Sequence, residues 1–338
     1  ARRRLHPMWF ALAGIAIASY FWEAAWYGAI LVGPIVTLGI VDMIQTKRAI
    51  RRNFPVIGHA RFLLEEIRPE IQQYFIESEM EEAPFNRAER SVVYQRSKGH
   101  LDTLPFGTQR DVYEVGYEWI NHSMMPVEPE TTDPRVVIGG KDCTRPYSAS
   151  ILNISAMSFG SLSGRAIEAL NIGAREGRFA HNTGEGGLSN HHQQGGDLIW
   201  QIGTGYFGCR DPQGRFDPNA FAERAALDTV KMIEIKISQG AKPGHGGILP
   251  AAKITPEIAK IRGVPLGRDV NSPPAHSAFS TPIGLLEFVA RLRELSGGKP
   301  VGFKLCIGKR REFLAVCKAM IETGIKPDYI AIDGGEGG

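Results

Sequence analysis

Two lysines stand in settings where an ammonium group needs an anion nearby. Lys304 lies within the otherwise apolar run "VGFKLC", and Lys242 lies in the glycine-rich stretch "QGAKPGHGG" that follows another apolar run. A lysine on a buried strand must find an anion or reach the strand end, because an unpaired buried charge is costly. A cation beside exposed loop N–H groups can also hold an anionic ligand. We interpret both as candidate anion-binding residues, and a solvated surface lysine is the alternative for Lys242.

A carboxylate stands between glycines in "NTGEGG". There Glu185 is either an exposed turn residue or a group that the bend turns toward a substrate. The histidines lack a consistent metal-ligand spacing, and the four cysteines include no C-x-x-C pair, so we predict no metal site and no disulfide framework. The histidines considered are His191, His192, His245 and His276. Scattered cysteines are typical of a reduced, cytoplasmic setting.

Asp333 joins a strand pattern to a glycine cluster in the final stretch, "DYIAIDGGEGG". Residues 329–332 have the composition of a buried strand, and Gly334 and Gly335 permit a bend that brings bare N–H groups close to a ligand. Such a bend commonly serves a phosphate or a flat cofactor. Because a closed α/β fold does not end on such a strand, we also expect the chain to be a fragment of a longer polypeptide.

The candidate residues follow predicted strands. After Pro126, strand patterns alternate with helix patterns, and each strand leads into a glycine or polar loop. The predicted strands are "SILNISAMSFG", "FAHNTGEGG", "KMIEIKISQGAKPGHGG", "PVGFKLCIG" and "DYIAIDGGEGG", and the predicted helices are "SGRAIEALNIGAREG", "TPEIAKIRG", "PIGLLEFVARLRELSGG" and "REFLAVCKAMIETG". This one-sided arrangement predicts a parallel (β/α)8 TIM barrel, incomplete in this chain. A doubly wound sheet is the alternative, but no G-x-G-x-x-G follows an early strand.

Two apolar runs, Pro7 to Trp22 and Trp26 to Ile44, open the chain, and arginines and lysines flank both outer sides. This pattern predicts a transmembrane helical hairpin over residues 1–46, with Glu23 on the far side, in a multi-pass protein of the inner membrane whose barrel lies on the cytoplasmic side. The first run is short, since its helix would reach about 24 Å against a hydrocarbon core of about 30 Å. A buried helix pair is the alternative, whereas the second apolar run disfavours a signal peptide.

Residues 47–125 are predicted to form a connector with no legible chemistry, and residues 126–338 the barrel domain. A helix is predicted over Ala60 to Ser78, interrupted at Pro69. The composition is that of a globular protein, with 43% hydrophobic and 22% charged residues. A net charge of +3 is too small to indicate a nucleic-acid partner.

Several motifs occur in an order that resembles one known family. They are "ISAMSFGSLS", "NTGEGG", "QIGTGYFG", "IKISQGAKPGHGG", "NSPPAHS", "FKL" and "DGGEGG". In sequence and spacing they resemble the FMN-binding synthase domain of the glutamate synthase family, over roughly residues 126–338. The predicted hairpin and connector look like the shorter, membrane-anchored single-domain branch of that family. The resemblance implies a (β/α)8 barrel with FMN at its strand ends, whose later strands, which usually hold the FMN phosphate, are missing here.

The resemblance also implies roles for particular residues around the flavin. Lys304 is expected near N1 and O2, where a fixed cation stabilises the anionic reduced ring and contributes to catalysis. Gln201 is expected to bond the polar edge of the ring. The cofactor-binding positions that match the family are Ala156, Met157, Ser158, Thr183, Gln201, Lys304, Asp333, Gly334 and Gly335.

On the substrate side, Lys242 and Arg262 match positions that hold the carboxylates of 2-oxoglutarate or its imine, and Glu185 is expected near the reacting end. The implied reaction is reductive amination of 2-oxoglutarate, through 2-iminoglutarate, to glutamate. Two departures leave the substrate open, because Ile248 stands where the large enzyme has a substrate-contacting Gln, and His245 where an acid is usual. The alternatives are another 2-oxo acid, an amine or N-substituted glutamate, or a non-catalytic scaffold subunit.

The partners implied are the small-molecule substrate with ammonia or an amine, the membrane, and a protein electron donor. No dinucleotide fingerprint is present, so electrons are expected from ferredoxin or from an NAD(P)H-oxidising subunit. The family's iron–sulfur cysteines lie downstream of the last strand, so such a cluster is expected only in a missing C-terminal part.

Overall fold

The structure is a computed structural model that describes residues 6–22, 27–71, 76, 85–100, 107–108, 111–128, 130–241, 246–335 and 337. The chain separates into two compact units, Ala1–Trp119 and Ile120–Gly338. The division falls before the start predicted for the barrel domain. Each unit is described by itself below.

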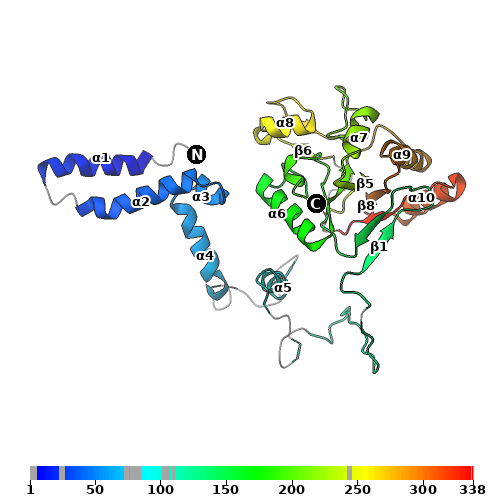
Figure 1. Cartoon of the computed structure of the whole chain (residues 1–338), viewed down its shortest axis with the longest axis horizontal. Coiled ribbons are helices and arrows are strands. Elements are labelled where there is room, and N and C mark those ends of the chain that lie inside the picture. Colours follow the sequence, from blue (N-terminus) through cyan, green and yellow to red (C-terminus); the bar gives the residue numbers. More distant parts are fainter. Residues whose placement is uncertain are drawn as a thin grey trace. The chain divides into compact units, whose positions relative to one another are not determined.

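The first unit is helical. Helices α1 (His6–Phe21) and α2 (Tyr27–Ile44) run side by side in opposite directions (Figure 1), and α3 (Ala49–Asn53), α4 (Ile57–Ile71) and α5 (Arg87–Ser97) follow. Asp42 ties the end of α2 to the start of α4, because its carboxylate accepts hydrogen bonds from the Val56 N–H and the His59 ring. Helix α4 begins three residues earlier than predicted and continues past Pro69, while most of the predicted remainder lies outside the described residues.

The two apolar runs thus form the predicted pair of helices. Within the part of the chain that the structure describes, no helix is both long enough and apolar enough to cross a membrane. Helix α1 has 16 residues, and α2 contains Pro34 and the buried Asp42. The transmembrane hairpin therefore has no support from this structure and stays a prediction.

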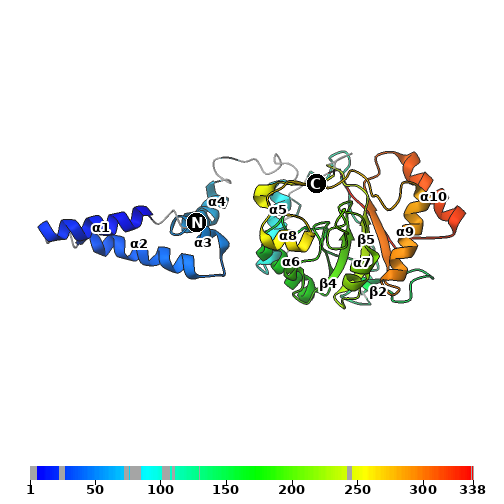
Figure 2. The ribbon, with the colours of Figure 1, turned by 90° about the horizontal axis from the view of Figure 1, so that it is seen from above.

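The second unit is built on a parallel sheet. Its strands are β3 (Ala180–Asn182), β4 (Asp197–Ile202), β5 (Val230–Lys236), β8 (Val301–Leu305) and β9 (Ile330–Ile332), hydrogen-bonded in that order. The sheet curls, with helices on its outer side (Figure 2). A curled, all-parallel α/β sheet is consistent with part of a TIM barrel.

The predicted helices of this unit are confirmed as α6 (Gly164–Gly177), α8 (Pro256–Arg262), α9 (Pro282–Leu295) and α10 (Arg310–Thr323). Ser163, Thr255 and Thr281 accept hydrogen bonds from backbone N–H groups in the first turns of α6, α8 and α9, as their N-cap positions predict. The sequence analysis did not identify strand β4 or helix α7 (Pro218–Ala225).

One strand prediction is wrong as a continuous element. Instead of one strand through "SILNISAMSFG", the chain forms β2 (Tyr147–Ser150) and then a single parallel bridge between Ile154 and His181. Asn153 turns the chain between them, because its side chain donates to the Ser150 carbonyl and accepts from the Ala180 N–H. A short antiparallel pair, β6 (Ile248–Leu249) with β7 (Val270–Asn271), lies in the segment that holds α8.

Side chains alternate between the two faces of the sheet, as the pleat requires. The outer face is apolar and packs against α7, α9 and α10. Its strand residues in the core are Leu198, Trp200, Ile202, Ile233, Ile235, Val301, Phe303 and Leu305. The alternate residues point to the inner face, where the lower layer is also apolar and comprises Ala180, Ile199, Met232 and the partly buried Tyr329. Two polar layers follow toward the carboxyl ends of the strands.

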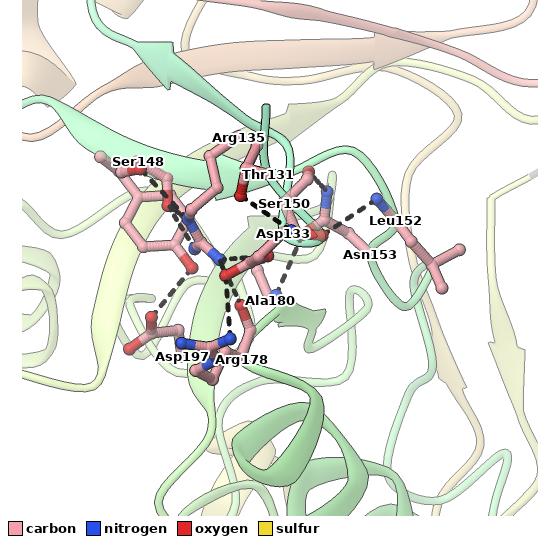
Figure 3. Close-up of polar contacts among 11 residues, drawn as sticks. Thr131, Asp133, Arg135, Ser148, Ser150, Leu152, Asn153, Arg178, Ala180 and Asp197 are labelled. Atoms are coloured by element: carbon pink, nitrogen blue, oxygen red, sulfur yellow. Dashed lines mark hydrogen bonds and ion pairs between the residues drawn. The ribbon is translucent and has the colours of Figure 1, made fainter. Parts of the chain in front are cut away.

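A two-stranded ribbon of β1 (Arg135–Ile138) and β2 covers the lower layer, since Tyr147 and Ala149 pack into it. Figure 3 shows the polar contacts that attach this ribbon to the sheet. The Arg135 guanidinium donates to the Ser148 hydroxyl at 3.1 Å and to the carbonyl of Arg178 at 2.8 Å. Asp133 accepts a hydrogen bond from Arg135 at 3.4 Å and forms an ion pair with Arg178 at 3.3 Å. These contacts hold the ribbon over the amino end of the sheet.

Candidate functional site

A buried carboxylate organises the first polar layer of the inner face. Glu234 on β5 is 3% exposed, and its Oε1 accepts hydrogen bonds from Asn182 Nδ2 at 2.8 Å and Gln201 Nε2 at 2.7 Å. Burial raises the pKa of Glu234, and the hydrogen bonds from Gln201 and Asn182 oppose that rise. The three residues come from neighbouring strands, and Gln201 and Glu234 are direct register partners.

Next along the strands, the second polar layer contains two lysines, each paired with a carboxylate. Lys236 on β5 is the register partner of Lys304 on β8. The Lys236 ammonium lies 2.7 Å from Glu185 Oε1 and also donates to Gln239, whereas the Lys304 ammonium lies 2.9 Å from Asp333 Oδ1. The lysine side chains are 12% and 13% exposed. Two cations and two anions therefore meet at the carboxyl end of the sheet, where barrel enzymes carry their chemistry.

Asp333 also holds the loop after β5. Its Oδ2 accepts from the Gly240 N–H at 3.0 Å, and the Asp333 N–H donates to the Leu305 carbonyl. Burial raises the pKa of Asp333, but the hydrogen bonds from Lys304 and Gly240 outweigh it and hold the pKa below its usual range. The backbones of Gly240 and Gly334 touch, so a Cβ at Gly240 would overlap the Gly334 carbonyl. The predicted glycine bend after β9 therefore packs against a second glycine bend.

The predicted segment Ala156 to Ser158 lies beside the end of β3. The Met157 N–H donates to the Asn182 carbonyl at 3.2 Å. Gly184, at φ 64°, approaches the Ser158 backbone so closely that a Cβ would lie 2.7 Å from the Ser158 nitrogen. Thr183 is fully buried, and its hydroxyl oxygen accepts from the Gln201 N–H at 3.1 Å. These predicted residues thus form the edge of the site next to Gln201.

Arg262, at the end of α8, lies beneath the glycine loops. Its Nη2 donates to the Phe159 carbonyl at 3.0 Å, and its guanidinium carbon lies 5.0 Å from the centre of the Phe207 ring. Burial lowers the pKa of this guanidinium, and the charge of Glu185 opposes that effect. A Cβ at Gly160 or at Gly186 would lie 3.0 Å from Nη2, so the two loops leave room for this side chain. Arg262 thus holds them together.

Lys242 and His245 lie outside the described residues, so the structure leaves their predicted roles open. Ile248 is described, and its side chain is 70% exposed on β6. The structure thus brings together most of the predicted cofactor-binding residues with Glu185.

Two functional candidates, Glu234 and Lys236, escaped the sequence analysis, although both lie in "KMIEIKI" and interrupt an apolar strand at alternate positions. The signal that singled out Lys304 was therefore present for both. The sequence analysis considered His276 only as a metal ligand, whereas in the structure its ring contacts the backbone of Lys236. Its Nε2–H donates to the Lys236 carbonyl at 2.7 Å, which leaves Nδ1 to accept from the Tyr206 hydroxyl at 3.0 Å. Burial lowers the pKa of His276, which favours the neutral ring, although the hydrogen bond to Lys236 and the charge of Glu185 oppose that effect.

Comparison with known proteins assigns the chain that carries this site to a family. The family model described as the conserved region in glutamate synthase matches residues 120–338. The chain belongs to the glutamate synthase family. This confirms the resemblance carried by the seven motifs, and the match begins where the second structural unit begins.

Curated relatives agree. The chain is 37% identical over 350 residues to the glutamate synthase large subunit-like protein YerD of Bacillus subtilis, covering 90% of this chain and 66% of the relative. It is 38% identical over 187 residues to the archaeal glutamate synthase [NADPH] of Archaeoglobus fulgidus, covering 54% of this chain and 33% of that protein. A glutamate synthase large subunit-like protein of Rhizobium meliloti is 31% identical over 250 residues, with 71% and 52% covered. The chain thus spans a third to two thirds of these glutamate synthase relatives.

Proposed function

We propose that this chain carries the FMN site of a glutamate synthase-type oxidoreductase, on a sheet that forms part of a (β/α)8 barrel. The observation that carries the proposal is the paired register of Lys236 and Lys304 above Gln201, at the carboxyl end of a parallel sheet in a glutamate synthase family member. This donor set suits a flavin, whose polar edge accepts hydrogen bonds at two carbonyls and whose reduced ring carries negative charge.

When bound, reduced FMN would supply a hydride to the carbon of a C=N bond, and a proton to nitrogen completes the amine. The residues of this chain bind and orient around that step. Lys304 is proposed to face N1 and O2 of the ring, with Asp333 holding its ammonium in place. Gln201 is proposed to bond the polar edge, and the Ala156 to Ser158 segment to line the ring.

The substrate proposed is the imine of 2-oxoglutarate with ammonia, giving glutamate. Glu185 is proposed to lie at the reacting end, since its carboxylate stands beside Lys236 and 2.6 Å from where a Cβ at Gly203 would be. Arg262 and Lys242 are proposed to bind the substrate carboxylates. Arg262 supports this role through its partly unsatisfied guanidinium, whose Nε makes no hydrogen bond to a described residue.

Electrons are proposed to come from ferredoxin or from an NAD(P)H-oxidising partner. Several relatives carry the name archaeal-type glutamate synthase [NADPH]. For this chain we expect that NADPH alone does not reduce the bound flavin at an enzymatic rate. Fast bleaching of the flavin absorbance by NADPH, with no partner present, would contradict that expectation.

A turnover panel tests the proposed reaction. Purified full-length protein with FMN and a chemical or ferredoxin reductant is incubated with 2-oxoglutarate and ammonium, and glutamate is measured. Parallel reactions replace 2-oxoglutarate by other 2-oxo acids, or ammonium by amines. We expect glutamate as the main product. A faster reaction with another 2-oxo acid would favour the second candidate, which the exposed Ile248 supports because it supplies no amide to the substrate. Absence of flavin binding would overturn the FMN proposal itself.

A further inference from the structure

Two amide side chains share one oxygen of Glu234, and this sharing fixes how each amide is turned. Asn182 Nδ2 and Gln201 Nε2 approach the same Oε1 at 2.8 and 2.7 Å. An ionised carboxylate only accepts hydrogen bonds, so both amides must present their NH2 groups to it. The NH2 and C=O ends of an amide are nearly the same size, and the hydrogen-bond network decides between them.

Asn182 gives an independent check on that orientation. Its Oδ1 accepts a hydrogen bond from the Gly184 N–H at 3.0 Å, and a backbone N–H can only donate. The NH2 group of Asn182 must therefore face Glu234, which makes Oε1 an acceptor even if a proton sits on the other carboxyl oxygen. Gln201 Nε2 then donates to that same acceptor.

The consequence for Gln201 is that its carbonyl oxygen remains for another partner. Among the described residues, none donates a hydrogen bond to Gln201 Oε1. The backbone of Gln201 is held separately, by its N–H bond to the Thr183 hydroxyl at 3.1 Å. A strand residue with a fixed backbone and one amide end engaged can present only the other end to a ligand.

We propose that Glu234 is a positioning residue that turns the Gln201 carbonyl toward the ligand, so that the site selects a ring with an N–H donor between two carbonyl groups. The inference rests on the proposed FMN site, because the flavin edge has this pattern, with N3–H between the carbonyls at C2 and C4. The Gln201 carbonyl then accepts a hydrogen bond from N3–H. The lysines of the second polar layer can donate to the acceptor atoms of the ring.

Burial supports this role over a purely structural one. Glu234 and Gln201 are 3% and 2% exposed, so a wrongly turned amide could not exchange its partner for bulk water. The raised pKa of Glu234 is compatible with the same role, since Oε1 accepts in either protonation state.

The test measures preference for FMN over 3-methyl-FMN, in which a methyl group replaces the N3 hydrogen. Apoprotein of the full-length protein is titrated with each flavin, and binding is followed by quenching of flavin fluorescence. The variants are Glu234→Leu, which removes the acceptor, and Glu234→Gln, which keeps an oxygen for both amides. Asn171→Ala is the matched control, because Asn171 is also buried and hydrogen-bonded, but to the loop before β4 at the other end of the sheet.

The wild-type protein and Glu234→Gln should both bind FMN with a Kd at least about tenfold lower than that for 3-methyl-FMN. A factor of about ten in Kd corresponds to the free energy of one hydrogen bond. In Glu234→Leu the freed Gln201 can turn or swing away, so the preference should fall by about tenfold. Asn171→Ala should lose thermal stability and keep the wild-type preference. Unchanged preference in Glu234→Leu, or a lost preference in Glu234→Gln, would overturn the role given to Glu234.

If Glu234→Leu does not fold, a swap decides the question. Gln201→Glu places two carboxyl groups side by side and should weaken FMN binding. Gln201→Glu combined with Glu234→Gln restores an amide donor facing a carboxylate acceptor, and most of the FMN affinity should return. Lack of recovery overturns the inference. Failure of the wild-type chain to bind FMN refutes the proposed function instead, and FMN binding with no preference over 3-methyl-FMN refutes only this inference.

Discussion

Lys236 and Lys304 lie directly opposite one another on the parallel strands β5 and β8, and each ammonium group is held by a different carboxylate. Adjacent parallel strands lie about 4.8 Å apart, so two unpaired ammonium groups here would repel strongly. Glu185 arrives from the loop after β3 and Asp333 from the end of β9. Each of these two segments therefore supplies the negative charge that offsets one lysine of the pair.

Replacement of Lys304 by Met should lower the reduction potential of bound FMN. The variant removes a cation from the site and leaves the Asp333 carboxylate behind, which disfavours the anionic reduced ring. We expect a loss on the order of 1–3 kcal/mol, or about 20–60 mV for a two-electron couple, measured by redox titration. Lys309→Met, at the exposed N-cap position of α10, is the control. An unchanged potential would show that Lys304 does not face the flavin.

Replacement of Glu185 by Gln should slow turnover while FMN stays bound. The neutral amide keeps the size of the side chain but loses the charge that pairs with Lys236 at 2.7 Å. We expect kcat to fall by about a hundredfold, the lower end of what positioned acid–base groups contribute. Glu257→Gln serves as control, because Glu257 is exposed and contacts His191 on the outside of α8. Equal kcat in both variants would remove Glu185 from the reaction.

Replacement of Gly240 by Ala should destabilise the site loops. The added methyl would overlap the Gly334 carbonyl and push the chain away from the Gly240 N–H bond to Asp333. We expect the free energy of unfolding to fall by about 1–3 kcal/mol, with weaker FMN binding. Gly173→Ala is matched to it, since a Cβ at that helical position meets nothing within 4 Å. That change should stabilise by about 0.5–1 kcal/mol, as thermal unfolding would show.

Stability should fall as the pH drops from about 6.5 to about 4. Burial lowers the pKa of His181 and of His192 to about 4, and their rings lie 5.4 Å apart. In that window the unfolded chain binds protons that the folded chain does not, so the folded state loses free energy as pH falls. For one of the two rings, the loss in free energy of unfolding should reach on the order of 3 kcal/mol once the pH has fallen to about 4 or below.

His181→Phe tests this assignment, because neither ring nitrogen of His181 has a hydrogen-bond partner among the described residues. The variant should unfold with a flatter pH dependence between about pH 4 and 6.5, measured by urea denaturation at each pH. An identical slope in the wild type and the variant would mean that other groups cause the acid sensitivity.

Much of the candidate site follows from local patterns. Lys304 and Asp333 stand out because each interrupts or ends an apolar strand. Since side chains alternate along a strand, both lie on the inner face of the sheet. The helices α6, α8 and α9 carry N-caps that mark their starts, so their predicted positions are confirmed. Such signals need only the residues within one element.

The break after β2 escaped prediction because Asn153 ends that strand through a bond to Ala180, which is distant in sequence. Helix α4 continues past Pro69 although the residue itself suggested an end. The break after β2 thus depends on a contact between residues distant in sequence, which a linear pattern does not contain.

The sequence by itself determined which side chains face the interior of the sheet, because alternation along a strand is a property of the backbone. Only the tertiary structure decided their partners. Glu185 forms an ion pair with Lys236, and Asp333 with Lys304. Glu234 accepts the hydrogen bond that orients the Gln201 amide. These pairs join segments brought together by strand order and register, and the direction of a hydrogen bond depends on every group around it.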